Sequence, residues 1–468
     1  SNAIMNISQA SSADQSPLVS THPDQDGLKF TADRARYTHT EKLLEAYEVP
    51  FIGIADARLM VPQGYVAVYE NAKMKAFQDA QIVADTSLEH HELYAVSIEV
   101  QGRLAVQGRG VYDYVDAGGS KQTIEFGELT VNEAGQFVAN GAIEQGQRFA
   151  LSPQFGFYGE VELLGVDPLL HMSGHTIVRQ ACSGLETSWV PFQSSIDPNQ
   201  IIIDLKYIDE VLGADSIYTG MALDHGSLEP YALLLAPKRH PKDVLMMSAK
   251  GLISYDQEGK AFTVTNHGRL KDDKNPSSIW VLSEETCSIQ AEGRVDLGAR
   301  NGQVAWSNYG VLSYNLNSEA LSYKGTLGLE FFFDEATLEF MHGKLMDEPM
   351  LQAANLSLPT TRRAYRSILG VKGSKEYFED IDRFGEVKKI PEDLQRTLMF
   401  ALVELEWKSD KQVWLSTGDL HLSNLGPFQV NRKIRGNIVL ERGAEEDELF
   451  VFVKATAQNY YFFNYRRN

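Results

Sequence analysis

The chain has 468 residues and a formal net charge of −20, from 63 acidic and 43 basic residues. Apolar residues make up 43% of the sequence and charged residues 23%, which is typical of a folded globular protein. The excess of negative charge repels phosphate groups, so it argues against a nucleic-acid partner. No apolar run reaches the roughly 20 residues that a membrane-spanning helix needs, and we expect a chain that does not span a membrane.

Residues 1–27 are expected to be a tag remnant and a disordered leader. Ser1-Asn2-Ala3 is typical of a cleaved expression tag, and the following residues are rich in Ser, Asp, Gln and Pro with little periodicity. Because Ile4 follows in place of an initiator Met, we expect the native chain to begin upstream, where a signal peptide could have been removed. After this leader, the amphipathic residues 40–47 predict a short helix.

Residues 28–333 carry a repeated strand signal. Eleven times in the chain a glycine is followed at +2 and +4 by aliphatic residues or tyrosine, as in GYVAV at Gly64 and GRVDL at Gly293. Positions +2 and +4 point to the same side of a strand, so each copy has one apolar face, and the glycine suits a turn before the strand. Short turn sequences between the segments favour antiparallel pairing. Residues 204–213 are an exception and predict one or two helical turns.

The pattern changes at residue 334. Asp334 is a favourable N-terminal residue for a helix whose apolar residues Leu338, Met341 and Leu345 recur at helical spacing. Further helices are predicted at 361–369, 375–384 and 391–402, and strand patterns return over residues 403–468. The sequence therefore predicts a mainly β fold, an antiparallel folded-over sheet or a β-sandwich or jellyroll, with a helical insertion at 334–402.

Catalytic and metal-binding motifs are not found. The sequence has no nucleophile elbow, phosphate-binding loop or dinucleotide fingerprint. Glu160 and Glu162 would serve as paired glycosidase carboxylates, but strand alternation places them on a solvated outer face. The sequence therefore indicates no catalytic residues and no cofactor.

The histidines do not form a recognisable metal site. His171 and His175 share one face of a predicted strand about 13 Å apart, too far for one ion. The adjacent His90 and His91 face opposite sides of a strand. Asp224-His225 predicts a turn. We therefore predict no metal.

Two features leave alternatives open. Cys182 and Cys287 either form one disulfide in an oxidising compartment or remain as two reduced thiols. The C-terminal aromatic residues form either a stacking platform for sugars or part of a sheet core. The alternation of Phe450 and Phe452 with valines favours a core strand that is buried on both faces.

Two segments carry a family resemblance. Residues 54–85 and 287–308 each contain an Ala-Asp or Ala-Glu pair, a turn, a glycine-led strand and another turn. This order resembles the β-jellyroll repeats of lipopolysaccharide-transport and organic-solvent-tolerance proteins, and the chain is also similar to large envelope proteins of unassigned function. The resemblance implies a folded-over sheet whose apolar interior accepts acyl chains, in an exported periplasmic or cell-surface protein. The helical insertion departs from that family and could fill the groove itself.

Our first hypothesis for function is a non-enzymatic envelope scaffold that binds a lipid, a glycan or a protein partner. A lipid groove would be lined by Val66, Val68, Leu104, Val106, Val161, Leu163, Val295 and Leu297. One alternative is a carbohydrate-active enzyme or carbohydrate-binding module, which needs a cleft with acidic side chains beside exposed aromatic residues. The other alternative is a purely structural or assembly protein.

Overall fold

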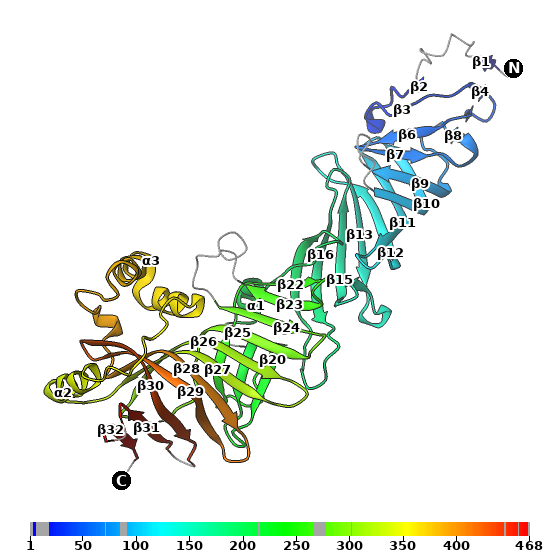
Figure 1. Cartoon of the computed structure of the whole chain (residues 1–468). Coiled ribbons are helices and arrows are strands. Elements are labelled where there is room, and N and C mark those ends of the chain that lie inside the picture. The colour runs from blue at the N-terminus through cyan, green and yellow to red at the C-terminus, as the bar shows by residue number, and fades with distance from the viewer. Residues whose placement is uncertain are drawn as a thin grey trace. The chain divides into compact units, whose positions relative to one another are not determined.

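The computed structural model describes residues 3–5, 18–70, 72–84, 91–213, 216–265, 278–300, 302–443, 446–456 and 458–466. The fold is mainly β, with antiparallel sheets and a small helical insertion, which confirms the predicted fold class. The chain divides into two compact units. Unit 1 consists of Ser1–Arg179 and Trp189–Ile201, and unit 2 consists of Gln180–Ser188 and Ile202–Asn468. Figure 1 shows both units and labels many of their elements.

Unit 1 contains a long antiparallel sheet and a small one. In spatial order, the long sheet is formed by β17 (Val190–Ile196), β16 (Leu170–Val178), β15 (Phe155–Leu164), β13 (Phe137–Ile143), β12 (Lys121–Val131), β11 (Ala105–Val115), β10 (His91–Gly102), β9 (Phe77–Ala84), β7 (Ala57–Met60), β6 (Phe51–Ile54), β3 (Lys29–Phe30) and β2 (Leu18–Val19), with β14 (Ala150–Ser152) beside β15. The small sheet has the order β1 (Ala3–Met5), β4 (Arg34–Thr38), β5 (Leu43–Tyr47) and β8 (Val66–Val68). Short 3-10 turns lie at Pro23–Gln25, Pro62–Gly64 and Gln145–Gln147.

The long sheet of unit 1 folds over on itself. The backbone N–H of Phe137, at the start of β13, donates to Asp56 Oδ1 at 2.6 Å. Asp56 precedes β7, and four strands separate β7 from β13 in the sheet. The apolar side of the strands faces inward, where Phe126, Phe137 and Phe157 are at most 1% exposed. The strand alternation therefore directs the polar side chains to the outer face.

Unit 2 has a second long antiparallel sheet and a three-stranded one. In spatial order, the long sheet is formed by β18 (Ile203–Asp204), β22 (Leu252–Asp256), β23 (Ala261–Thr265), β24 (Ile279–Ser283), β25 (Ser288–Arg294), β26 (Ala305–Asn315), β27 (Leu321–Glu330), β28 (Leu398–Lys408), β29 (Val413–Leu425), β30 (Phe428–Glu441), β31 (Glu448–Lys454) and β32 (Tyr460–Tyr465). The short sheet has the order β20 (Pro230–Ala236), β19 (Tyr218–Leu223) and β21 (Val244–Ser248). Helix α1 (Leu205–Leu212) follows β18 and is capped by Asp204.

The long sheet of unit 2 also curls. Phe331, just after β27, packs against Phe463 of β32 with ring centroids 5.7 Å apart, although four strands lie between β27 and β32. The three-stranded sheet joins this core through Tyr314, whose hydroxyl donates to the carbonyl oxygen of Pro230 at 3.3 Å.

The helical insertion interrupts one continuous sheet, because β27 pairs directly with β28. It contains α2 (Glu335–Met346), α3 (Pro359–Phe384) and a 3-10 turn at Glu392–Leu394. Helix α3 kinks at Gly370, whose φ is 73°, and is visibly bent in Figure 1. Tyr365 and Phe378 of α3 share a buried cluster with Met399 of β28, so the insertion covers one face of the sheet. Among the described residues, no helix combines the length and apolarity needed to cross a membrane.

Three local predictions are wrong. Residues 40–47 form no helix, because Leu43–Tyr47 pair with β4 as strand β5. The helix predicted at 391–402 is only a 3-10 turn, and β28 begins at Leu398 with six consecutive buried residues, as suits a strand covered on both sides. The leader contains β1, β2 and the turn at Pro23–Gln25, where no structure was expected.

The glycine-led segments form strands, but most of their glycines do not lie at turns. Nine of the eleven lie within strands: Gly102, Gly110, Gly127, Gly159, Gly293, Gly310, Gly325, Gly418 and Gly436. Several of these glycines pair with another glycine across the sheet, as Gly159 does with Gly174. A Cβ at Gly174 would lie 2.2 Å from the Tyr158 carbonyl oxygen, so the glycines permit a close approach of neighbouring backbones.

Candidate functional site

A groove of about 940 Å³ crosses the outer face of unit 1. It runs over β12, β13, β15, β16 and β17, and its lining residues are mostly polar. The alternation that buries Val161 and Met172 turns their polar neighbours Glu162 and His171 outward. The groove is therefore a property of the solvent-facing side of the sheet.

Strand register aligns five polar residues across the groove. Glu128 lies opposite Asn140, Asn140 opposite Glu162, Glu162 opposite His171, and His171 opposite Ser195. Cross-strand partners on one face have Cβ atoms about 5 Å apart, so these side chains form a continuous row. We call this row the polar ladder. It offers carboxylate, amide, imidazole and hydroxyl groups to a single ligand.

Hydrogen bonds fix the imidazole of the polar ladder. Ser195 Oγ lies 2.9 Å from His171 Nδ1, and His171 Nε2 lies 2.9 Å from Asp167 Oδ2. Asp167 Oδ1 in turn accepts the backbone N–H of Leu169 at 2.9 Å, which holds the carboxylate in place. The result is a serine–histidine–aspartate relay at one end of the groove.

Three aromatic rings extend the same outer face. Tyr158 precedes Glu160 by two residues on β15 and lies opposite His175 of β16. The Tyr158 and His175 rings stack with centroids 5.0 Å apart, and Trp189 meets Tyr158 edge-on at 4.8 Å. All three side chains are partly exposed. This aromatic cluster lies one register step beyond Glu160.

The groove is electrostatically negative. Among its described lining residues, Glu125, Glu128, Glu160 and Glu162 are acidic, and none is Lys or Arg. Such a surface repels anions and favours neutral or positively charged ligands.

The eight residues predicted to line a lipid groove are divided between the two units. Six lie in unit 1 and two in unit 2. Within the two units, Leu104 is 37% exposed and Val68 is partly exposed, while six are buried: Val66, Val106, Val161, Leu163, Val295 and Leu297. Lipid binding along these residues stays a prediction.

For some residues of the groove, the sequence correctly predicted which face of the sheet they lie on. Glu160 and Glu162 are exposed on the outer face, as expected, but their alignment with His171 and Ser195 was missed because it depends on the register of several strands. His91 is buried and His90 lies outside the described residues.

The C-terminal aromatic residues divide between two faces. Phe463 is buried, whereas Tyr460 and Phe462 are 59% and 57% exposed. Phe450 and Phe452 are only partly buried, so the expectation of a strand buried on both faces is wrong at these positions.

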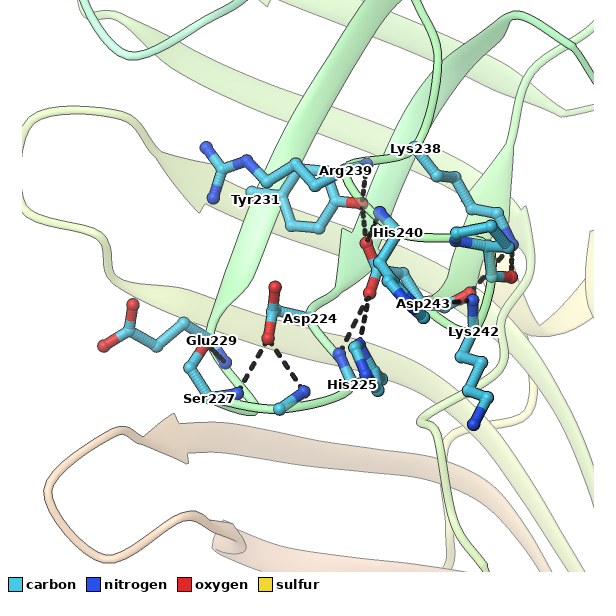
Figure 2. A network of polar contacts seen from close by, with 12 residues as sticks. Asp224, His225, Ser227, Glu229, Tyr231, Lys238, Arg239, His240, Lys242 and Asp243 are labelled. Carbon is cyan, nitrogen blue, oxygen red and sulfur yellow. Dashed lines mark hydrogen bonds and ion pairs between the residues drawn. The ribbon is translucent and has the colours of Figure 1, made fainter.

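A second polar cluster lies in unit 2, and Figure 2 shows it. It gathers His225, His240 and Asp243 from the loops that flank β20 and β21. One candidate ligand atom from each residue lies within 4.8 Å of the others. The turn predicted at Asp224-His225 is present, with Asp224 Oδ1 accepting the backbone N–H of Gly226 at 2.8 Å. His240 and Asp243 were not identified from the sequence, because no histidine motif connects them to His225.

Asp243 is the centre of this cluster, and its side chain is fully buried. Its Oδ1 accepts the backbone N–H of His225 at 3.0 Å, and its Oδ2 accepts the Tyr231 hydroxyl at 2.6 Å and the backbone N–H of His240 at 2.9 Å. Burial alone would raise the pKa of Asp243, but these hydrogen bonds hold it below its ordinary value. Burial and the bond to Asp243 raise the pKa of Tyr231.

The two cysteines are joined in unit 2. Cys182 and Cys287 form a disulfide with Cα atoms 5.5 Å apart, which closes a sequence separation of 105 residues. This resolves the alternative that the sequence left open in favour of the bridge.

Comparisons with protein-family models, with curated proteins and with solved structures found no match for this chain.

Proposed function

We propose that unit 1 binds a neutral or amino-bearing glycan in the outer-face groove. The observation that carries the proposal is the polar ladder, which continues onto the aromatic cluster. Sugar hydroxyls donate to carboxylates such as Glu162 and accept from amides such as Asn140, while the apolar C–H faces of a sugar ring stack on rings such as Trp189. A groove of about 940 Å³ is large enough for an oligosaccharide.

Charge and burial favour a glycan over the other ligands considered. The four glutamates in the groove repel anionic sugars and anionic lipid head groups. The apolar residues expected to hold acyl chains are mostly packed in the interior. A protein partner remains an outcome of the test below.

Export to the cell envelope is the accompanying proposal. The disulfide between Cys182 and Cys287 supports it, because disulfides persist in oxidising compartments and are rare in the cytosol. The resemblance of residues 54–85 and 287–308 to envelope repeats also supports it. Probing the endogenous protein in separated cell fractions would test this part, and recovery in the cytosol with reduced thiols would oppose it.

A glycan array probed with the full chain tests the ligand. We expect retention of neutral or amino-bearing glycans, and weaker binding after Glu162→Gln or Trp189→Ala. Glu99→Gln is the matched control, since Glu99 is an exposed glutamate of β10 on the same sheet but outside the groove lining. Strongest binding to acidic glycans, or no glycan binding with a co-purified lipid or protein instead, would contradict the proposal.

A second candidate function is hydrolysis of an acyl ester on the bound glycan. The relay of Ser195, His171 and Asp167 favours it, because a hydroxyl within 2.9 Å of an imidazole that a carboxylate orients is the arrangement of an activated nucleophile. Ser195 Oγ would attack the acyl carbon as its proton passes to His171 Nδ1, and His171 would then protonate the departing sugar oxygen. Water would hydrolyse the acyl-serine through the same base.

A fluorophosphonate probe tests this second function. We expect labelling of Ser195 that is lost in Ser195→Ala and His171→Ala, with Ser173→Ala, another groove serine, as the control. If the wild-type chain is not labelled, the groove is a binding site only.

A further inference from the structure

Two loops at one end of the three-stranded sheet bring two imidazoles to a carboxylate. His225 follows β19 and Asp243 precedes β21, and these strands pair at Leu223 and Val244. His240 lies in the connection from β20 to β21 and stacks on His225, with ring centroids 3.9 Å apart and an interplanar angle of 18°. His225 and Asp243, 18 positions apart in the sequence, thus lie together with His240.

We propose that His225, His240 and Asp243 bind a divalent transition-metal ion, with zinc as the best fit. Two imidazole nitrogens and a carboxylate oxygen form a ligand set that zinc uses in proteins. His225 Nδ1 and Asp243 Oδ1 are 3.2 Å apart. An ion about 2.1 Å from each atom subtends an angle of about 100°, which is close to tetrahedral. One candidate ligand atom of His240 lies within 4.8 Å of those of His225 and Asp243.

The carboxylate is held in place before any ion binds. Three hydrogen bonds to Asp243 come from the backbone N–H groups of His225 and His240 and from the Tyr231 hydroxyl. The ion replaces only the contact between His225 Nδ1 and Asp243 Oδ1. Such surrounding hydrogen bonds orient ligands and strengthen metal sites. The backbone N–H of Lys242 also donates to His240 Nδ1 at 3.1 Å and orients that ring.

The local charge is compatible with a cation. Lys238 Nζ is occupied by the carbonyl oxygens of Pro241 and Asp243, and the Lys242 side chain extends away from the cluster in Figure 2. Arg239 lies over the Tyr231 ring at 4.3 Å. The acidic Asp224, Glu229 and Asp243 balance these three basic residues. His225 is 40% exposed, so water completes the coordination.

Isothermal titration of the tag-free full chain with zinc tests the proposal. We expect one ion per chain, with affinity lowered at least about 100-fold by His225→Ala or His240→Ala. His22→Ala is the control, because His22 pairs with Asp24 at 3.9 Å and does not belong to the metal-ligand cluster found among the described residues. His225→Gln keeps a polar side chain, and circular dichroism without metal checks that each variant folds.

Cobalt provides a second measurement. A four-coordinate cobalt ion gives visible absorption bands that zinc lacks, and we expect them in the wild-type chain and in His22→Ala but not in His225→Gln. The proposal is overturned if the wild-type chain binds neither ion at millimolar concentration. It is also overturned if His225→Ala and His240→Ala bind zinc as tightly as the wild type. The site lies in unit 2, so neither result bears on the glycan proposal for unit 1.

Discussion

At the scale of single residues, Asp447 neutralises a buried guanidinium in unit 2. Its side chain and that of Arg442 are 0% and 1% exposed, and the carboxylate Oδ1 lies 3.3 Å from Arg442 Nε. The backbone N–H of Arg300 donates to Asp447 Oδ2 at 2.7 Å, so the pair also ties the segment after β25 to the turn after β30. Burial lowers the pKa of Arg442, although the charge of Asp447 opposes this shift.

Asp447→Ala should therefore destabilise the protein strongly. Removing one partner leaves a buried charge without compensation, which costs about 3–5 kcal/mol. Asp419→Ala is the matched control, because Asp419 pairs with Lys433 at the surface and such pairs contribute at most about 1 kcal/mol. Urea unfolding of both variants measures the difference. Equal losses of stability would show that the Arg442 charge is not buried as described.

At the scale of elements, facing glycines allow neighbouring strands to approach closely in the sheet of unit 1. A Cβ at Gly174 would lie 2.2 Å from a backbone oxygen, whereas a Cβ at Gly127 meets nothing within 4 Å. We expect Gly174→Ala to lower the free energy of unfolding by about 1–3 kcal/mol, as overpacking does. Gly127→Ala should change it by less than about 1 kcal/mol. Thermal unfolding measures both variants, and a harmless Gly174→Ala would contradict this role.

The same elements show what sequence patterns can predict. Alternation correctly indicated that Val161 and Leu163 face inward and that Glu160 and Glu162 face outward, because side-chain direction on a strand is a local property. The position of the glycines was missed, because the contact between Gly159 and Gly174 depends on how two strands pair.

The two candidate sites could not be predicted from the sequence either, because they also depend on how strands pair. The polar ladder requires the register of β12 through β17, which turn lengths and bulges determine together. His225 and Asp243 meet only because β19 pairs with β21 while β20 lies on the other side of β19. Neither arrangement leaves a motif in the sequence.

At the scale of the whole molecule, the disulfide is a constraint confined to unit 2. It links Cys182, in the segment Gln180–Ser188, to Cys287 just before β25. A disulfide between residues about 100 positions apart lowers the conformational entropy of the unfolded chain. This stabilises the folded state by about 2–5 kcal/mol. We expect a Cys182→Ser, Cys287→Ser double variant to lose this stability.

Hydrogen exchange shows which part of the protein loses stability in the double variant. In the double variant, the strands β24 to β26 should exchange faster, while the strands of unit 1 keep their protection. Faster exchange in unit 1 with no change around β25 would contradict the assignment of the disulfide to unit 2.

We propose that the outer face of unit 1 binds a glycan through the polar ladder and the aromatic cluster. Calorimetric titration of the full chain with the glycan that the array retains most strongly measures this binding. We predict saturable binding that Trp189→Ala weakens at least about tenfold, a loss of about 1.4 kcal/mol, while Glu99→Gln leaves it unchanged. Equal affinity of the wild type and Trp189→Ala, with both folded, would contradict the claim.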